Sequence, residues 1–154
     1  MTEQDNQEEQ EDQQEFGIHS IYLKDVSFES PNAPEIFTTE FKPEIQMGVN
    51  IDTSPLGDDV YEVVLSITVS AKAGEKTGFL VELHQAGIFT LKGFNEETLG
   101  PMLGIYCPNV LFPYARESTA SLVTKGGFPQ LLLEPVNFEA MYAQHQENQQ
   151  GTIQ

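Results

Sequence analysis

The sequence predicts an α+β fold, in which strands come first along the chain and helices follow. Four strand-like runs occupy its first part, and helical patterns begin only near Asn95. The connections between the last three strands are short, which favours antiparallel pairing because a parallel pair needs a long crossover. The densest apolar and aromatic segment, residues 104–117, lies in the helical part. So much apolar surface must bury against the sheet, another subunit or both.

The first strand is expected over residues 16–28, and its apolar phase changes along the way. Ile21 and Leu23 share one face, whereas Val26 and Phe28 fall on the other. A β-bulge between the two pairs is the simplest way to absorb this change. Beyond the bulge, three alternate residues then form one polar face: Asp25, Ser27 and Glu29.

Three further strands are predicted from two-residue alternation of apolar and polar side chains. Residues 45–51 alternate as a half-buried strand, and a turn over residues 53–59 leads into a strand over residues 61–69. A hairpin at residues 73–78 begins a fourth strand that includes Phe79, Val81 and Leu83. We expect the chain to leave the sheet over residues 87–93.

The helices are predicted from apolar spacing and from capping residues. Asn95 can cap a short helix, and a central helix then continues to Lys125, where two glycines stop it. Pro108 fits the first turn of the central helix, where its missing N–H costs nothing. After a linker over residues 128–136, Asn137 is expected to cap a last helix.

The ends of the chain are more polar than its middle. Residues 1–15 contain seven acids and no Lys or Arg, so we expect a disordered acidic tail there. Residues 16–142 are expected to form one domain, and residues 143–154 a flexible polar tail. No basic and apolar signal segment opens the chain, and no apolar run is long enough to span a bilayer. These features predict a cytosolic protein that does not insert into membranes.

The formal net charge of −17 limits the expected partners. An acidic surface repels phosphate backbones, so nucleic acid is not expected as a partner. The three histidines lie on different elements and the chain has one cysteine, so neither a metal site nor a cofactor is expected: His19, His84, His145 and Cys107.

Few residues offer chemistry. A hydrolase could be built only on Asp58, Asp59 or Cys107, but acids in a turn are usually solvated and a lone cysteine among apolar residues is usually buried. Arg116 could bind an anion, or it could pair with a carboxylate or carbonyl within or between subunits. No nucleotide-binding motif is present.

Two surface features are candidates for binding. The first is an acidic patch of Asp25, Ser27 and Glu29 with Glu82, although four ordinary solvated residues would have the same spacing. The second is an apolar groove, for which ordinary core residues are the simpler interpretation. Its candidate residues are Phe37, Phe41, Phe138, Met141 and Tyr142.

Several long segments, in order over residues 16–142, resemble the SecB family of bacterial protein-export chaperones. They are Lys24–Pro34, Asp58–Val64, Gly87–Phe89, Gly104–Glu117, Phe128–Leu131 and Pro135–Phe138. The resemblance implies a four-stranded antiparallel sheet backed by C-terminal helices, and a homotetramer built as a dimer of dimers. It also implies a non-enzymatic, ATP-independent holdase that binds unfolded precursor proteins and delivers them to the motor ATPase SecA. The alternative is an acidic adaptor that recognises one folded partner.

The resemblance also assigns roles to particular residues. It maps SecA binding onto Asp25, Glu29, Leu80 and Glu82. It maps client binding onto the five groove residues, with Phe41 at a position where the family often has Trp. Burial of the central helix between subunits implies an oligomer interface at Leu111, Ala115, Arg116, Thr119 and Leu122.

Overall fold

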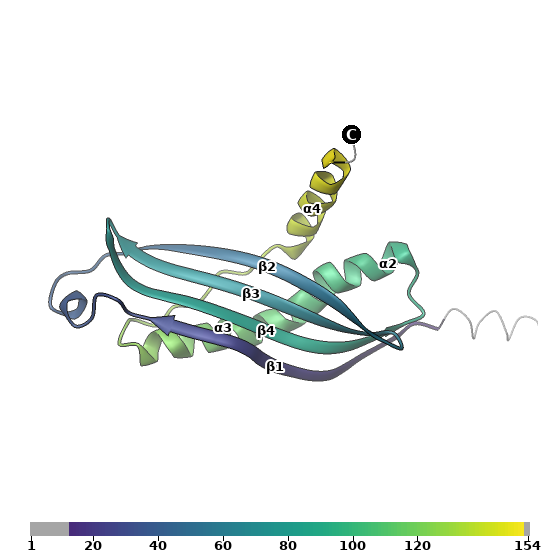
Figure 1. Cartoon of the computed structure of the whole chain (residues 1–154), viewed down its shortest axis with the longest axis horizontal. Helices are drawn as coiled ribbons and strands as arrows, with labels where there is room; N and C mark the ends of the chain where they lie inside the picture. Colours follow the sequence, from purple (N-terminus) through teal and green to yellow (C-terminus); the bar gives the residue numbers. More distant parts are fainter. Residues whose placement is uncertain (1–12, 153–154) are drawn as a thin grey trace, which may run out of the picture.

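The computed structural model describes residues 13–152 and arranges them as a sheet with helices on one of its faces (Figure 1). The expected order of four strands followed by helices is confirmed. The strands are β1 (Glu15–Glu29), β2 (Glu44–Gly57), β3 (Val60–Ala73) and β4 (Lys76–Lys92). The helices are α2 (Glu96–Pro101), α3 (Cys107–Lys125) and α4 (Phe138–Thr152), with a 3-10 turn η1 (Glu35–Phe37) and a π-helical segment η2 (Met102–Tyr106).

The four strands form one antiparallel sheet in the order β1-β4-β3-β2. Two of the expected boundaries are wrong. Residues 87–92 remain in β4, because the alternation continues there and Phe89 and Leu91 are buried opposite β1. Residues 53–57, expected in a turn, extend β2, which leaves only Asp58 and Asp59 to join it to β3.

Strand β1 contains the expected bulge. The pairing of Leu23 with Gln85 is followed by that of Asp25 with His84, so Lys24 is the extra residue. A second shift, which we did not expect, lies between Ile18 and Ser20. Because of the bulge at Lys24, the residues on both sides of it keep their apolar side chains toward the helices.

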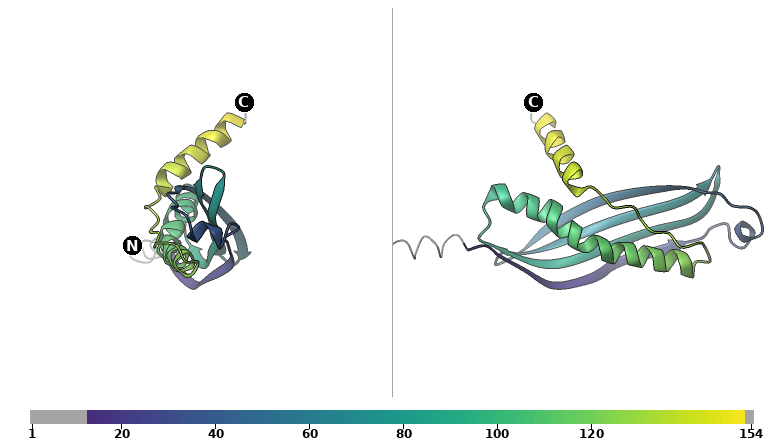
Figure 2. Two further views of the ribbon diagram at one scale, coloured as in Figure 1. Left: turned by 90° about the vertical axis from the view of Figure 1, so that its left-hand side faces the viewer. Right: turned by 180° about the vertical axis from the view of Figure 1, so that it is seen from behind.

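The core lies between the helix-facing side of the sheet and α3, as the view from behind shows (Figure 2). Alternate residues of β3 and β4, such as Leu65, Ile67 and Leu83, are fully buried there. They meet one face of α3, whose buried hydroxyl at Thr119 donates to the Ala115 carbonyl at 2.8 Å. The predicted sheet-and-helix packing is therefore confirmed for this helix.

The predicted caps are also confirmed. The Thr98 amide donates to Asn95 Oδ1 at 3.0 Å, and the Ala140 amide donates to Asn137 Oδ1 at 3.0 Å. Between α2 and α3 the π-helical η2 keeps the helix continuous from Glu96 to Lys125. Pro108 follows this segment at the start of α3 and so lies inside the continuous helix. The expectation that its missing N–H falls at a free helix start is therefore wrong.

The two expected tails have different outcomes. Residues 1–12 lie outside the described residues, so the acidic tail stays a prediction there, while Glu15 already belongs to β1. The flexible tail expected from residue 143 is wrong over residues 143–152. Helix α4 continues through them to Thr152 and projects away from the sheet (Figures 1 and 2).

Gly87 allows α3 to approach β4 closely. A Cβ at this position would lie 2.7 Å from the Phe89 ring and 3.0 Å from Leu111 Cδ2. We predict that Gly87→Ala lowers the free energy of unfolding by about 1–3 kcal/mol, because overpacking forces buried neighbours to move. Chemical denaturation measures this change.

The matched control is Gly17→Ala, also in a paired strand, where the new Cβ would meet its nearest neighbour at 3.8 Å. This variant should be as stable as the parent protein, within about 0.5 kcal/mol. Equal stability of the two variants would show that the close approach at Gly87 does not constrain the core.

Candidate functional site: two surfaces on a one-sided sheet

The face of the sheet opposite the helices carries the predicted acidic patch. Across the β1–β4 pairing, Ser27 lies opposite Glu82 and Glu29 lies opposite Leu80. Glu82 therefore sits diagonally between Glu29 and Asp25, and all three carboxylates are exposed. The structure brings together the four residues that the resemblance assigns to SecA binding.

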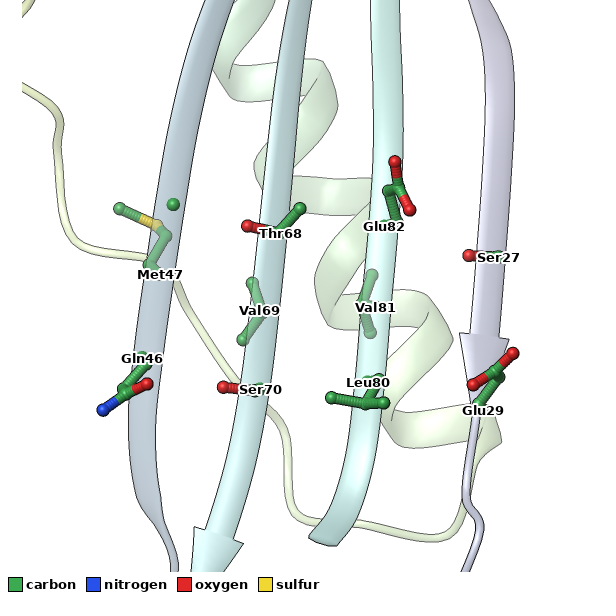
Figure 3. A pocket seen from close by; sticks show the side chains of 11 residues that line it. Ser27, Glu29, Gln46, Met47, Thr68, Val69, Ser70, Leu80, Val81 and Glu82 are labelled. Atoms are coloured by element: carbon green, nitrogen blue, oxygen red, sulfur yellow. The ribbon is translucent and has the colours of Figure 1, made fainter.

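Beside this patch the outer face has a shallow depression of about 530 Å³ (Figure 3). Figure 3 shows Glu29, Leu80 and Glu82 along one side of it. Its other side is formed by small or uncharged residues that we had not singled out for binding: Gln46, Gly48, Thr68 and Ser70. The alternating pattern predicts that these four residues point outward. It does not show which outward residues lie beside Glu82, which follows from the sheet order β1-β4-β3-β2.

The carboxylate of Glu82 lies beside the imidazole of His84. His84 Nε2 lies 3.2 Å from Glu82 Oε1, and the Glu82 side chain remains 59% exposed. A contact this open to water contributes little to stability and leaves the carboxylate available to a partner. The charge of the patch is therefore accessible from solvent.

A hydrogen-bonded cluster of Tyr22, Lys24 and Glu62 borders the patch. Lys24 Nζ donates to Glu62 Oε1 at 2.8 Å, and the Tyr22 hydroxyl donates to Glu62 Oε2. The hydrogen bonds from Lys24 and Tyr22 lower the pKa of the Glu62 carboxyl. Burial and the neighbouring Glu62 raise the pKa of the Tyr22 hydroxyl to about 12. This cluster was missed because it joins β1 to β3 across β4, and no sequence spacing indicates such a contact.

Residues 30–43, the crossover segment, connect β1 to β2. An aromatic cluster lies where this segment meets the end of α3. The ring centroids of Phe37 and Phe41 lie 5.1 Å and 6.3 Å from that of Phe128. Phe79 packs on the same ring at 5.0 Å. Phe37 is 50% exposed, so the cluster presents an aromatic surface to solvent.

The other predicted groove residues lie elsewhere, so one continuous groove containing all five is not what the structure describes. Met141 and Tyr142 line a cavity of about 270 Å³ between α4, η2 and β2. Tyr142 packs on Gly104, where a Cβ would lie 2.6 Å from its ring. The expectation that Phe138 lines an open groove is wrong, since it is 1% exposed and packs against Phe112 at 6.2 Å.

The predicted oligomer interface on α3 also needs correction. Leu111, Ala115 and Thr119 are fully buried against their own sheet, so they cannot meet another subunit in this fold. Leu122 and Arg116 are only partly buried. The outer side of α3 instead borders a depression of about 620 Å³, whose lining includes Phe112, Pro113, Arg116, Glu117 and Leu132. Arg116 Nε is buried there without a hydrogen-bond partner among the described residues.

The residues considered for hydrolysis are not arranged for catalysis. Cys107 is fully buried, and burial raises the pKa of its thiol to about 12. Asp58 and Asp59 are exposed at the β2–β3 turn with φ of 54° and 60°. Within residues 13–152 no group of His, Cys, Asp and Glu side chains is placed to hold a metal ion. No helix in the same part of the chain is long and apolar enough to cross a bilayer.

Comparison with known families decides the identity. A family model described as preprotein translocase subunit SecB matches residues 9–149. The chain belongs to the SecB family. It is 57% identical over 145 residues to the protein-export protein SecB of Nitrosococcus oceani, which covers 93% of this chain and 88% of that protein. It is 48% identical over 149 residues to SecB of Methylococcus capsulatus, covering 97% of this chain and 96% of that one.

A solved structure agrees with the SecB fold. It is a SecB-like chaperone from Mycobacterium tuberculosis in complex with a ChAD peptide from an antitoxin, with a TM-score of 0.61. At 19% identity, it covers 79% of this chain and 91% of its own. This similarity supports the fold alone, and the function comes from the family match.

Family membership makes this chain a protein-export chaperone and not an enzyme. The predicted family and the predicted absence of enzymatic activity are thereby confirmed. The acidic adaptor and the hydrolase are no longer needed as alternatives. The residues that serve each step of SecB function stay predictions.

Proposed function

We propose that this SecB-family chaperone holds unfolded precursor proteins in the cytosol without ATP and delivers them to the motor ATPase SecA. The observation that supports the proposal most directly is that an acidic surface and an exposed aromatic surface lie apart on this chain. The acidic residues lie on the bare face of the sheet, whereas the exposed aromatic cluster lies beside the crossover segment and α3. Two chemically different surfaces suit two different partners.

The acidic face suits a basic docking surface on SecA. Asp25, Glu29 and Glu82 point the same way from paired strands, with Leu80 beside them as an apolar contact. Each exposed ion pair contributes only about 0–1 kcal/mol, so several must act together. Salt should weaken this attraction, because mobile ions screen exposed charges.

We predict that Asp25→Lys combined with Glu82→Lys weakens SecA binding at least about tenfold, because attraction becomes repulsion at two places. Calorimetric titration with SecA measures the affinity. The matched control is Glu96→Lys with Glu139→Lys, which changes the net charge equally at exposed positions on α2 and α4. Similar affinities of the two double variants would reject docking at the acidic face.

Client binding is assigned to the exposed aromatic cluster of Phe37, Phe41 and Phe128, with the cavity beside Tyr142 as a second contact. Aromatic rings offer large apolar contact areas without strict directional demands, which suits binding of unrelated unfolded chains. Phe37 contributes the most exposed ring of the cluster and rests on the buried Phe128.

We predict that Phe37→Ala slows or weakens capture of an unfolded precursor several-fold while the melting temperature changes little, because half of its surface is already in water. Suppression of precursor aggregation measures capture. Leu56→Ala is the matched control, since Leu56 is 55% exposed near the β2–β3 turn. If both variants hold the precursor equally well, clients do not use this cluster.

The proposed assembly is a homotetramer. Its support in this chain is exposed apolar surface: Ile18, Leu23 and Val26 of the edge strand β1 are 48%, 47% and 41% exposed. Tyr114 on α3 is 50% exposed beside this edge, and the Arg116 depression lies on the outer side of the same helix. Burial of these surfaces by other copies would remove them from water and supply partners for Arg116.

We predict a native mass of four 17.2-kDa chains at micromolar concentration. Leu23→Glu should reduce that mass, since a carboxylate buried without a partner is costly. Leu56→Glu, at an equally exposed site outside the proposed interfaces, should leave it unchanged. Native mass spectrometry and light scattering measure both, and a monomeric parent protein would contradict the assembly.

A further inference from the structure

The bulge at Lys24 decides which face of the sheet carries Asp25 and Glu29. Before the bulge, Leu23 lies on the helix-facing side of β1, opposite the buried Gln85. Uninterrupted alternation would turn Asp25 to that same side, because a slip of one residue moves every following side chain to the other face. The extra residue instead leaves Ser27 opposite Glu82 on the outer face. The acidic patch therefore depends on the bulge.

The side chain of Lys24, the extra residue, is hydrogen-bonded to a residue of another strand. Lys24 Nζ reaches across β4 to Glu62 Oε1 on β3, at 2.8 Å. The Glu62 side chain is only 16% exposed and also accepts the Tyr22 hydroxyl, which comes from the other side of the bulge. Both hydrogen bonds go to a charged carboxylate, which makes them stronger than bonds between neutral groups, while the Lys24 side chain itself is 50% exposed. Glu62 thus joins two residues that flank Leu23.

We infer that Glu62 is a positioning residue for the acidic surface: through Lys24 and Tyr22 it holds the β1 bulge, and the bulge keeps Asp25, Ser27 and Glu29 on the outer face beside Glu82. Its contact with Lys24 also occupies an ammonium group that would otherwise be free beside Asp25. The inference rests on the proposed docking of SecA to this face.

The direction in which one substitution changes SecA affinity distinguishes positioning of the acidic residues from an effect of net charge. Lys24→Met removes a positive charge beside the acidic patch, so charge alone predicts tighter binding of a basic partner. Positioning predicts the opposite, a loss of about three- to tenfold in SecA affinity at low salt, equivalent to roughly a kcal/mol. The matched control is Lys92→Met, which removes an exposed lysine at the far end of β4 and should not weaken binding.

A second measurement follows the cluster without SecA. In Glu62→Gln the pKa of Tyr22 should fall from about 12, since the neighbouring carboxylate and its hydrogen bond contribute to that value. Ultraviolet titration measures it, with Tyr22→Phe identifying the signal. In Lys24→Met, NMR should show loss of the close contact between Ser27 and Glu82 and faster amide exchange around Asp25.

The outcomes distinguish the inference from the function it rests on. Weaker docking of Lys24→Met with a disturbed β1 supports the inference. Unchanged β1 signals in Lys24→Met overturn it, whatever the SecA affinity, because the bulge would then stand without its contact to Glu62. A disturbed β1 with unchanged SecA affinity supports positioning and overturns docking at this face. Unchanged SecA affinity of the Asp25→Lys with Glu82→Lys variant also overturns docking at this face.

Discussion

The packing of α3 against one face of the sheet is the contact on which the other features depend. It buries alternate residues of β3 and β4, and it leaves intervening residues such as Thr68 and Glu82 exposed on the other face. Since side chains alternate strictly along a strand, covering one face determines what the other can present. The acidic face is thus a consequence of how the core is built.

The spacing of the acidic side chains on that face has a physical basis. Asp25, Glu29 and Glu82 belong to two strands paired along most of their length, so their spacing does not depend on a loop. The aromatic cluster has a different setting, because Phe37 belongs to a short 3-10 turn in the crossover between β1 and β2. A charged surface on paired strands and an apolar one on a connecting segment are compatible with one specific partner and many clients.

Two errors of sequence interpretation, both about helices, have a common cause. An apolar stripe on a helix shows that the stripe is buried, but not by what. The resemblance implies that Leu111, Ala115 and Thr119 meet another subunit, whereas their own sheet covers them. The resemblance places Phe138 in an open groove, whereas it lies in the core against Phe112. In both cases the residues are buried, but what covers them differs from what the resemblance implies.

The sequence by itself determined the order of strands and helices, the caps at Asn95 and Asn137, and the bulge before Asp25. These features arise from alternation, capping and turn chemistry, which act over a few neighbouring residues. Tertiary structure alone decided that β1 lies beside β4, that Lys24 reaches Glu62, and that Phe37 and Tyr142 occupy separate sites. Those contacts join residues far apart in the chain, where the packing of whole elements, and not local preference, determines the neighbours.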